Sequence, residues 1–545
     1  MGNKSSIMAV LVASLFLAAA VAVISDDNEN GVDQAFTDLA FANDGVLLNK
    51  ANFGGTAAEE FFDVIIVPDG FVAVGYSDYN SFGNGDWTPD LGADVVGYGD
   101  RDAIIVKFTA NWTVAWKQYF GGAGDDGFYG VAMMNLPDTQ DNYLLLAVGY
   151  SGYDSFGNGS WYSLNPDVVG YGSSDAIIVA FNDDGTLSDA LYFGGAGADC
   201  FNAIAVSPLN GDVYAVGYSE ASSFTGSGYW VEQGFSAKGN DDAILVVYRD
   251  GMLNTAMTFG GAGEDGFNDV TVSSNGDVFA VGYSYYDSFG TGDWEDVDGK
   301  GNYDAIIVAY MWDSGKNTVS FGGAMNFGGA GHDMFNGVGV TSQGAVFAVG
   351  YSYYDSFGTG DWVGVTGWGK SDAIIVGFED YAIFGALNFG GADDDYFNAV
   401  AVSPSGDVYA VGHSYYDSFG TGDWADVEGK GSYDAIIAVY SEAEFVGAMN
   451  YGGVDDDGFR AVTLLPDGYV IAVGYSYHDS FGTGDWDGVD GNGDYDAIAM
   501  RLDVTIDTGG DISDDGGSLP WTFIAIGAVA AISVISLAYF LVFKP

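Results

Sequence analysis

The sequence predicts an all-β fold, a seven-bladed β-propeller, plus one C-terminal transmembrane helix. Three short phrases recur together in seven copies between residues 45 and 503 and indicate the propeller: Phe-Gly-Gly (once Tyr-Gly-Gly), Ala-Val-Gly-(Tyr/His)-Ser and Asp-Ala-Ile. Repetition at 62 to 73 residues is typical of propellers and solenoids. The first phrase starts at Phe53, Phe120, Phe193, Phe259, Phe327, Phe389 and Tyr451.

One copy contains the strands of one blade. Residues 398–403 alternate between apolar and polar types, residues 404–407 form a turn, and residues 408–414 read as a second strand. A long loop, 415–433, leads to a nearly continuous apolar strand at 434–440 and a fourth strand at 447–451. Four short strands per repeat are typical of a propeller blade.

The two ends of the repeat region are complementary. Residues 46–53 resemble a fourth strand with no strands before it, and the last copy stops after its third strand near residue 502. We therefore expect the N-terminal strand to complete the last blade, because such closure removes an exposed sheet edge. The predicted propeller domain spans residues 45–503.

Composition restricts the function. The chain has 76 acidic and 14 basic residues, a formal net charge of −62. Such a surface repels phosphate backbones, so we expect no nucleic-acid partner. The acidity indicates a saline, acidic or calcium-containing medium, or it reflects aspartates that serve turns. The single cysteine, Cys200, excludes an intrachain disulfide and reads as a small core residue.

Both ends of the chain carry membrane signals. Residues 1–25 read as a signal peptide, with an N-terminal anchor as the alternative, and residues 26–44 as a short leader. Residues 504–520 form an acidic, Gly-rich tether, and residues 521–543 carry no charge over a length that suits one transmembrane helix. These signals predict a single-pass membrane protein, with the propeller at the cell surface and a very short cytoplasmic tail.

The repeats resemble the seven-bladed β-propeller repeat family of exported bacterial and archaeal proteins. In the third copy, the matching elements are Gly-Gly-Ala-Gly-Ala-Asp at 194–199, Gly-Asp-Val-Tyr at 211–214 and Asp-Ala-Ile at 242–244. The loop between the second and third strands is longer here than in that family. The resemblance implies an exported propeller and no single activity.

That long loop is the first candidate site. It reads Asp-Ser-Phe-Gly-Thr-Gly-Asp-Trp at 287–294, and equivalent loops must gather on one face of the ring. Tryptophan and aspartate side chains there suit carbohydrate, because sugars stack on aromatic rings and bond to carboxylates. The alternative is that the aromatic rings fill the gaps between blades. The candidate ligand-binding residues are Trp294, Trp362, Trp424, Trp486, Asp293, Asp361, Asp423 and Asp485.

The next part of the loop suggests calcium. Clustered carboxylates with glycines are typical of calcium sites, although the spacing is not that of an EF-hand. The alternative is that Asp-Gly pairs form turns and that the Asp of Asp-Ala-Ile accepts hydrogen bonds from backbone amides. The candidate metal ligands are Asp296, Asp298, Asp304, Asp487, Asp490, Asp494 and Asp496.

A second acid recurs shortly after each Phe-Gly-Gly. We expect it to accept backbone hydrogen bonds between blades, with a ring of acids facing the central channel as the alternative. These residues are Glu59, Asp126, Asp199, Asp265, Asp333, Asp395 and Asp457.

The sequence favours binding over catalysis. It contains no nucleophile elbow, phosphate loop or zinc-ligand spacing. An insertion at 311–325, with a spare Phe-Gly-Gly, reads as a lengthened turn. We therefore expect a membrane-anchored cell-surface module for adhesion to carbohydrate or an envelope protein. A purely architectural envelope component is the alternative, and a propeller enzyme ranks third.

Overall fold

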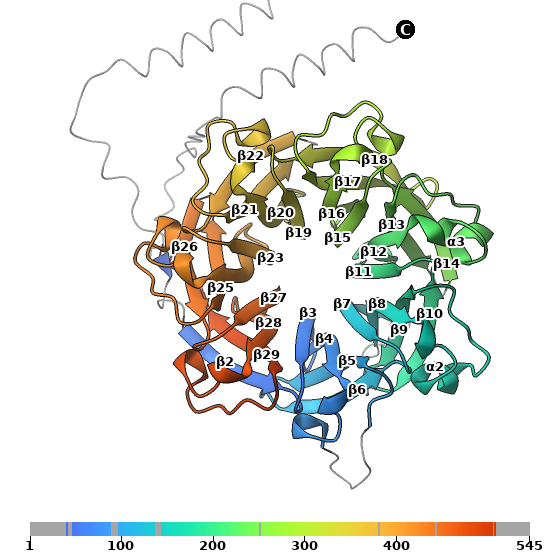
Figure 1. Cartoon of the computed structure of the whole chain (residues 1–545), viewed down its shortest axis with the longest axis horizontal. Coiled ribbons are helices and arrows are strands. Elements are labelled where there is room, and N and C mark those ends of the chain that lie inside the picture. The colour runs from blue at the N-terminus through green and yellow to red at the C-terminus, as the bar shows by residue number, and fades with distance from the viewer. Residues whose placement is uncertain are drawn as a thin grey trace, which may run out of the picture.

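The computed structural model of the chain describes residues 40–41, 46–88, 96–136, 143–249, 252–379, 382–441, 444–504 and 506–507. Seven four-stranded antiparallel sheets are arranged around a central opening, as Figure 1 shows. The predicted all-β, seven-bladed propeller is therefore confirmed. The predicted signal peptide (1–25) and transmembrane helix (521–543) lie outside the described residues. So do the leader and the tether, apart from residues 40–41, 504 and 506–507.

The innermost strand of each blade begins at the recurrent acid, and the second strand ends near the Gly-(Tyr/His)-Ser phrase. The innermost strands are β3 (Glu59–Val67), β7 (Asp126–Asn135), β11 (Asp199–Val206), β15 (Asp265–Val272), β19 (Asp333–Val340), β23 (Asp395–Val402) and β27 (Asp457–Leu464). The second strands are β4 (Gly70–Asp78), β8 (Tyr143–Gly152), β12 (Val213–Glu220), β16 (Val278–Tyr285), β20 (Val346–Tyr353), β24 (Val408–Tyr415) and β28 (Val470–Tyr477).

The third strand carries Asp-Ala-Ile, and the outer strand ends at the aromatic residue of Phe-Gly-Gly. The third strands are β5 (Arg101–Thr109), β9 (Ser174–Asn182), β13 (Asp241–Arg249), β17 (Tyr303–Asp313), β21 (Ser371–Glu379), β25 (Tyr433–Ser441) and β29 (Tyr495–Asp503). The outer strands are β6 (Val114–Phe120), β10 (Leu187–Phe193), β14 (Met252–Phe259), β18 (Thr318–Phe327), β22 (Ala382–Phe389), β26 (Glu444–Tyr451) and β2 (Val46–Phe53).

The N-terminal strand β2 is the outer strand of the last sheet. It pairs antiparallel with β29, from Val46 opposite Asp503 to Phe53 opposite Ala497. The sheet order is β2-β29-β28-β27, so this blade combines strands from both ends of the repeat region. The short strands β1 (Ala40–Phe41) and β30 (Ile506–Asp507) also pair with each other.

Two local features differ from the sequence predictions. The insertion at 311–325 lengthens a hairpin instead of a turn, because β17 and β18 stay paired out to Asp313 opposite Thr318. Short helices, α2 (Gly159–Leu164) and α3 (Tyr229–Glu232), replace the 3₁₀ turns of other copies in the second and third blades. No helix among the described residues is long and apolar enough to cross a membrane.

The core lies between neighbouring sheets. One cluster joins Ala373 and Phe389 of the fifth blade to Phe397 and Ile436 of the sixth, and each of these four residues is at most 2% exposed. Strands buried on both faces explain the continuous apolar runs in the third strands. Cys200 is buried, in agreement with its predicted role as a core residue.

Candidate functional site

The four candidate tryptophans are core residues. Trp294, Trp362, Trp424 and Trp486 each have 0% exposed surface. In the sixth blade, the Trp424 ring meets the edge of Phe389 at 4.9 Å between ring centroids, and Phe389 belongs to the preceding blade. A ring without accessible surface offers no face to a sugar. The structure therefore contradicts sugar stacking by these tryptophans and agrees with the alternative, packing between blades.

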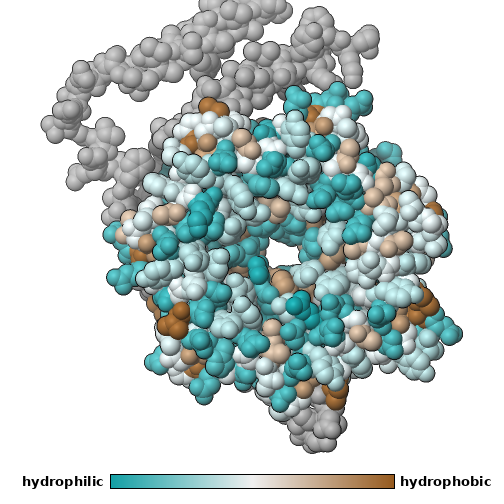
Figure 2. Space-filling model, in the orientation of Figure 1, coloured by the Kyte–Doolittle hydropathy of each residue, from teal (hydrophilic) through white to brown (hydrophobic). Residues whose placement is uncertain are grey.

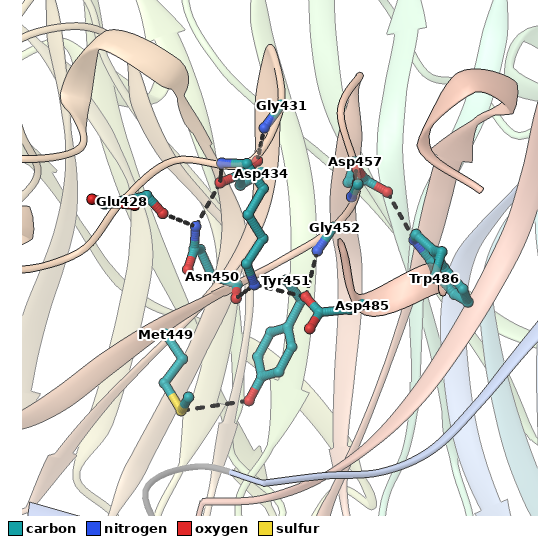
Figure 3. Close-up of polar contacts among 12 residues, drawn as sticks. Glu428, Gly431, Asp434, Met449, Asn450, Tyr451, Gly452, Asp457, Asp485 and Trp486 are labelled. Atoms are coloured by element: carbon teal, nitrogen blue, oxygen red, sulfur yellow. Dashed lines mark hydrogen bonds and ion pairs between the residues drawn. The ribbon is translucent and has the colours of Figure 1, made fainter. Parts of the chain in front are cut away.

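The aspartate before each of these tryptophans also joins adjacent blades. Asp485 accepts a hydrogen bond from the Gly452 backbone N–H at 2.9 Å, as Figure 3 shows. It also pairs with Lys430 Nζ of the preceding blade at 2.7 Å. The equivalent Lys–Asp pairs, each at 2.6 Å, are Lys238–Asp293 and Lys300–Asp361. In the remaining copy, Asp423 accepts the Gly390 N–H at 3.0 Å. These carboxylates are already engaged between blades, which argues against a primary role in ligand binding.

The recurrent acid lies at the centre of a buried polar network. Asp457 is 0% exposed, and its Oδ2 accepts the Gly453 N–H at 2.8 Å and the Ser480 hydroxyl at 2.9 Å. Its Oδ1 accepts the Ser476 hydroxyl and, at 3.0 Å, the indole N–H of Trp486. The predicted acceptance of a backbone hydrogen bond is confirmed, but the donor lies four residues earlier in the chain, and the other donors are side chains of the same blade. The alternative of an acid exposed to the channel is wrong. The phrase Gly-(Tyr/His)-Ser is repeated because each copy needs this serine hydroxyl.

Burial dominates the electrostatics of these acids. Removal from water raises the pKa of Asp457 to about 6 and that of Asp126 and Asp395 to about 7, although hydrogen bonds to the carboxylates oppose the shift. Burial raises the pKa of Glu59, the equivalent residue in the first blade, to about 8. Protonation of this set near neutral pH therefore couples to folding.

The predicted calcium ligands do not form a cluster. Asp304 is buried and accepts backbone N–H groups from Lys300 and Gly301, both at 2.9 Å. Asp496 is buried in the same way and accepts the N–H of Asn492 at 2.9 Å. The other five predicted ligands, Asp296, Asp298, Asp487, Asp490 and Asp494, are exposed. Within the described ranges, no group of three or more His, Cys, Asp or Glu side chains is placed to hold a metal ion. The structure thus supports the alternative for Asp304 and Asp496, in which the Asp of Asp-Ala-Ile accepts hydrogen bonds from backbone amides.

The loops between second and third strands do expose aromatic rings, at another position. A 3₁₀ turn follows the second strand in each blade, and in six blades it begins with Tyr or His whose ring points into solvent. These six residues, named here the loop-face ring, are Tyr79, Tyr153, Tyr286, Tyr354, Tyr416 and His478. The tyrosines are 47–58% exposed, and the third blade has Ala221 instead. The next residue is an exposed Asp in five blades and Asn80 in the first.

Sequence reasoning missed the loop-face ring because it gave weight to the best-matched motif. The segment predicted to bind ligand, 287–294, begins one residue after Tyr286 and includes the tryptophan that recurs in every copy. A large aromatic residue that recurs in every copy indicates packing here, because the equivalent interfaces between blades need a side chain of the same shape. The useful signal was a repeated tyrosine directly after a strand end and directly before an acid, both outside the apolar pattern.

The central channel holds a second candidate region. A cavity of about 520 Å³ is lined by innermost strands from all seven blades, and Figure 2 shows the opening at the centre of the disc. Its lining includes Tyr129, Tyr396, Asn398, His413 and Arg460. Burial lowers the pKa of His413 to about 3, so this imidazole is neutral at physiological pH. The recurrent acids were the only channel candidates predicted from the sequence, and none of them is among the residues that line this cavity.

The comparisons with known proteins show little about function. No family model and no curated protein matches the chain. Solved structures that resemble it include the Pan2 WD40 domain of Neurospora crassa, with 8% identity, 84% of this chain and 95% of that chain covered, and a TM-score of 0.40. A putative 6-phosphogluconolactonase of Bacteroides fragilis has 11% identity, coverage of 78% and 97%, and a TM-score of 0.36. A gluconolactonase of Xanthomonas campestris has 10% identity, coverage of 68% and 94%, and a TM-score of 0.28. The resemblance to the exported repeat family stays a prediction.

Proposed function

We propose that the protein is a membrane-anchored cell-surface module that binds a repeating carbohydrate through the loop-face ring. The observation that supports this most is the recurrence of an exposed aromatic ring beside a polar side chain at one position in six of the seven blades. An aromatic ring can stack on the C–H face of a sugar, and a neighbouring Asp or Asn can accept or donate hydrogen bonds to its hydroxyls.

Repetition suits a polymeric ligand. One half-exposed tyrosine gives a weak contact, but six equivalent sites held on a rigid ring act together when the ligand carries repeated units. Linked sites raise apparent affinity by about 10²- to 10⁴-fold over one site. The exposed position of these side chains also fits this role, because each ring contributes little to the core.

The location at the cell surface rests on the sequence alone. The apolar segment 521–543 and the acidic tether 504–520 support anchoring, and the net charge of −62 favours a partner without dense negative charge. A neutral polysaccharide meets that condition better than a polyanion does.

A glycan array probed with the soluble residues 40–507 tests the proposal. We expect binding to an extended neutral glycan that falls at least tenfold in the triple variant Tyr286→Ala, Tyr354→Ala, Tyr416→Ala, with the melting temperature nearly unchanged. A matched control removes three exposed aromatic rings from the hairpin edges, in Phe321→Ala, Phe384→Ala, Phe445→Ala, and should keep binding. Equal loss in both triple variants, or no glycan bound by the parent protein, would contradict the proposal.

A further inference from the structure

A ladder of amide side chains runs around part of the central channel. The residue after the buried Phe of the innermost strand is Asn in four consecutive blades: Asn202, Asn268, Asn336 and Asn398. Each Nδ2 donates a hydrogen bond of 2.7–2.9 Å to the backbone carbonyl of the equivalent Phe in the next blade. These bonds fix the amide groups, so that the cavity wall carries oriented polar groups.

In the seventh blade, the position equivalent to these asparagines is occupied by Arg460. Its Nε donates to Glu60 Oε1 of the first blade at 2.5 Å, and its guanidinium carbon lies 5.1 Å from the Tyr475 ring centroid and 5.8 Å from that of Phe62. Among the described residues, Glu60 is its only hydrogen-bond acceptor, so the terminal nitrogens Nη1 and Nη2 keep their N–H donors for another partner. A third of the side-chain surface, 33%, is accessible.

The free edge of this guanidinium lies where two cavities meet. Arg460 lines the channel cavity of about 520 Å³ and a neighbouring pocket of about 250 Å³, which also contains Tyr76, Tyr433 and Tyr495. It is the one cationic residue in the lining of either cavity. Two planes of aromatic surface hold the guanidinium in place, which reduces the entropy lost when it binds a partner.

Nearby acids oppose an anionic ligand less than their number suggests. Glu60 is already paired with Arg460. Asp456 also lines the smaller pocket, and burial, followed by the charge of Asp455, raises its pKa. Asp63 and Asp269, also in the channel wall, each accept two backbone N–H groups, and burial raises the pKa of both to about 7. A large share of these two carboxyls is therefore uncharged near neutral pH.

We propose that the channel is a binding site for a small polyhydroxylated carboxylate, such as a sugar acid, whose carboxylate pairs with the terminal nitrogens of Arg460. Guanidinium and carboxylate groups form paired, parallel hydrogen bonds. The amide groups of the asparagine ladder suit hydroxyl groups, and Phe62 and Tyr129 supply apolar contact to the carbon skeleton. This inference goes beyond the loop-face proposal, since it concerns another region and another chemical class of ligand.

Isothermal titration with D-glucuronate and D-glucose tests the inference, in about 0.5 M NaCl so that the acidic surface is screened. We expect glucuronate to bind the parent protein at least tenfold more tightly than glucose. Arg460→Gln should weaken glucuronate binding about 10- to 100-fold, which is the range for a charged hydrogen-bonding pair. Arg460→Lys, which keeps the charge and loses the paired geometry, should weaken it by a smaller factor.

The control is Arg501→Gln, which removes the same charge from an ion pair with Asp467 outside both cavities. It should leave glucuronate binding unchanged. A melting curve shows whether each variant is folded, and Arg460→Lys serves as the test if Arg460→Gln is not. Equal affinity for glucose and glucuronate, no binding of glucuronate at 10 mM probe, or an equal effect of Arg501→Gln would overturn the inference.

Discussion

Trp424→Ala and Tyr416→Ala, two changes in the same loop, compare the loss of a packing residue with the loss of a surface residue. Trp424 has no exposed surface, and its indole N–H donates to Asp395 Oδ1 and to Ser414 Oγ, both at 3.1 Å. Tyr416 begins the turn eight residues earlier and is 54% exposed. Both changes remove one large aromatic side chain from the same loop, so their comparison shows the effect of burial.

The magnitude follows from burial. A buried tryptophan removes about 150–250 Å² from water, which corresponds to about 4–6 kcal/mol at ~25 cal/mol per Å². This is an upper bound, because the unfolded chain already buries some surface, and substitutions of this kind cost about 3–5 kcal/mol. We expect Trp424→Ala to lower the free energy of unfolding by about 3–5 kcal/mol, and Tyr416→Ala to change it by about 0.5 kcal/mol or less.

Urea unfolding followed by far-ultraviolet circular dichroism measures both changes. The midpoint of Trp424→Ala should fall far below that of the parent protein, while the midpoint of Tyr416→Ala stays close to it. A Trp424→Ala protein of parental stability would refute the packing role of the tryptophans. It would restore them as candidates for ligand binding.

Two further predictions use the same loops and the buried acids. Gly422→Ala should lower the free energy of unfolding in urea by about 2 kcal/mol or more beyond the effect of Gly420→Ala. Both glycines have positive φ, but only at Gly422 would a new Cβ lie 2.2 Å from the Gly390 carbonyl oxygen. Equal midpoints for the two variants would show that Gly422 is not in close contact with the Gly390 carbonyl group of the preceding blade. The free energy of unfolding should fall as pH rises from about 4 to about 7. Burial raises the pKa of Asp126 and Asp395 to about 7 in the folded protein, whereas the value in the unfolded chain is near 4. The folded state therefore binds more protons in that interval and loses this stabilisation as the protons dissociate. Unfolding midpoints at pH 5 and pH 8, at one ionic strength, measure this, and a higher midpoint at pH 8 would contradict it.

The sequence was sufficient for the blades because their signals are local and repeated. The short, β-branched-rich apolar run that begins at each Asp-Ala-Ile favours a strand buried on both faces. The turn at 404–407 separates two strands that the structure pairs as β23 and β24. The outer strand was predicted at 447–451 but begins at Glu444. Its first two residues, Glu444 and Phe445, are exposed, so no alternation of apolar and polar types marks where the strand starts.

The candidate site was less predictable, because exposure depends on contacts between blades. Trp294 and Tyr286 are both aromatic residues in one polar loop, but Trp294 packs against Phe259 from the preceding blade and donates its indole N–H to Ser284. The role of Arg460 depends on Glu60, which is 400 residues away in sequence. Pairing across the junction of the first and last blades cannot be read from either segment alone.

The most direct test of a closed ring with one shared loop face is hydrogen exchange of the N-terminal strand β2. If Val46–Phe53 is the outer strand of the last blade, its amides should be protected to within about tenfold of those in β26, the outer strand of the blade before. Exchange of the β2 amides at the rate of an unstructured peptide, with β26 still protected, would contradict closure and the gathering of the seven loops on one face.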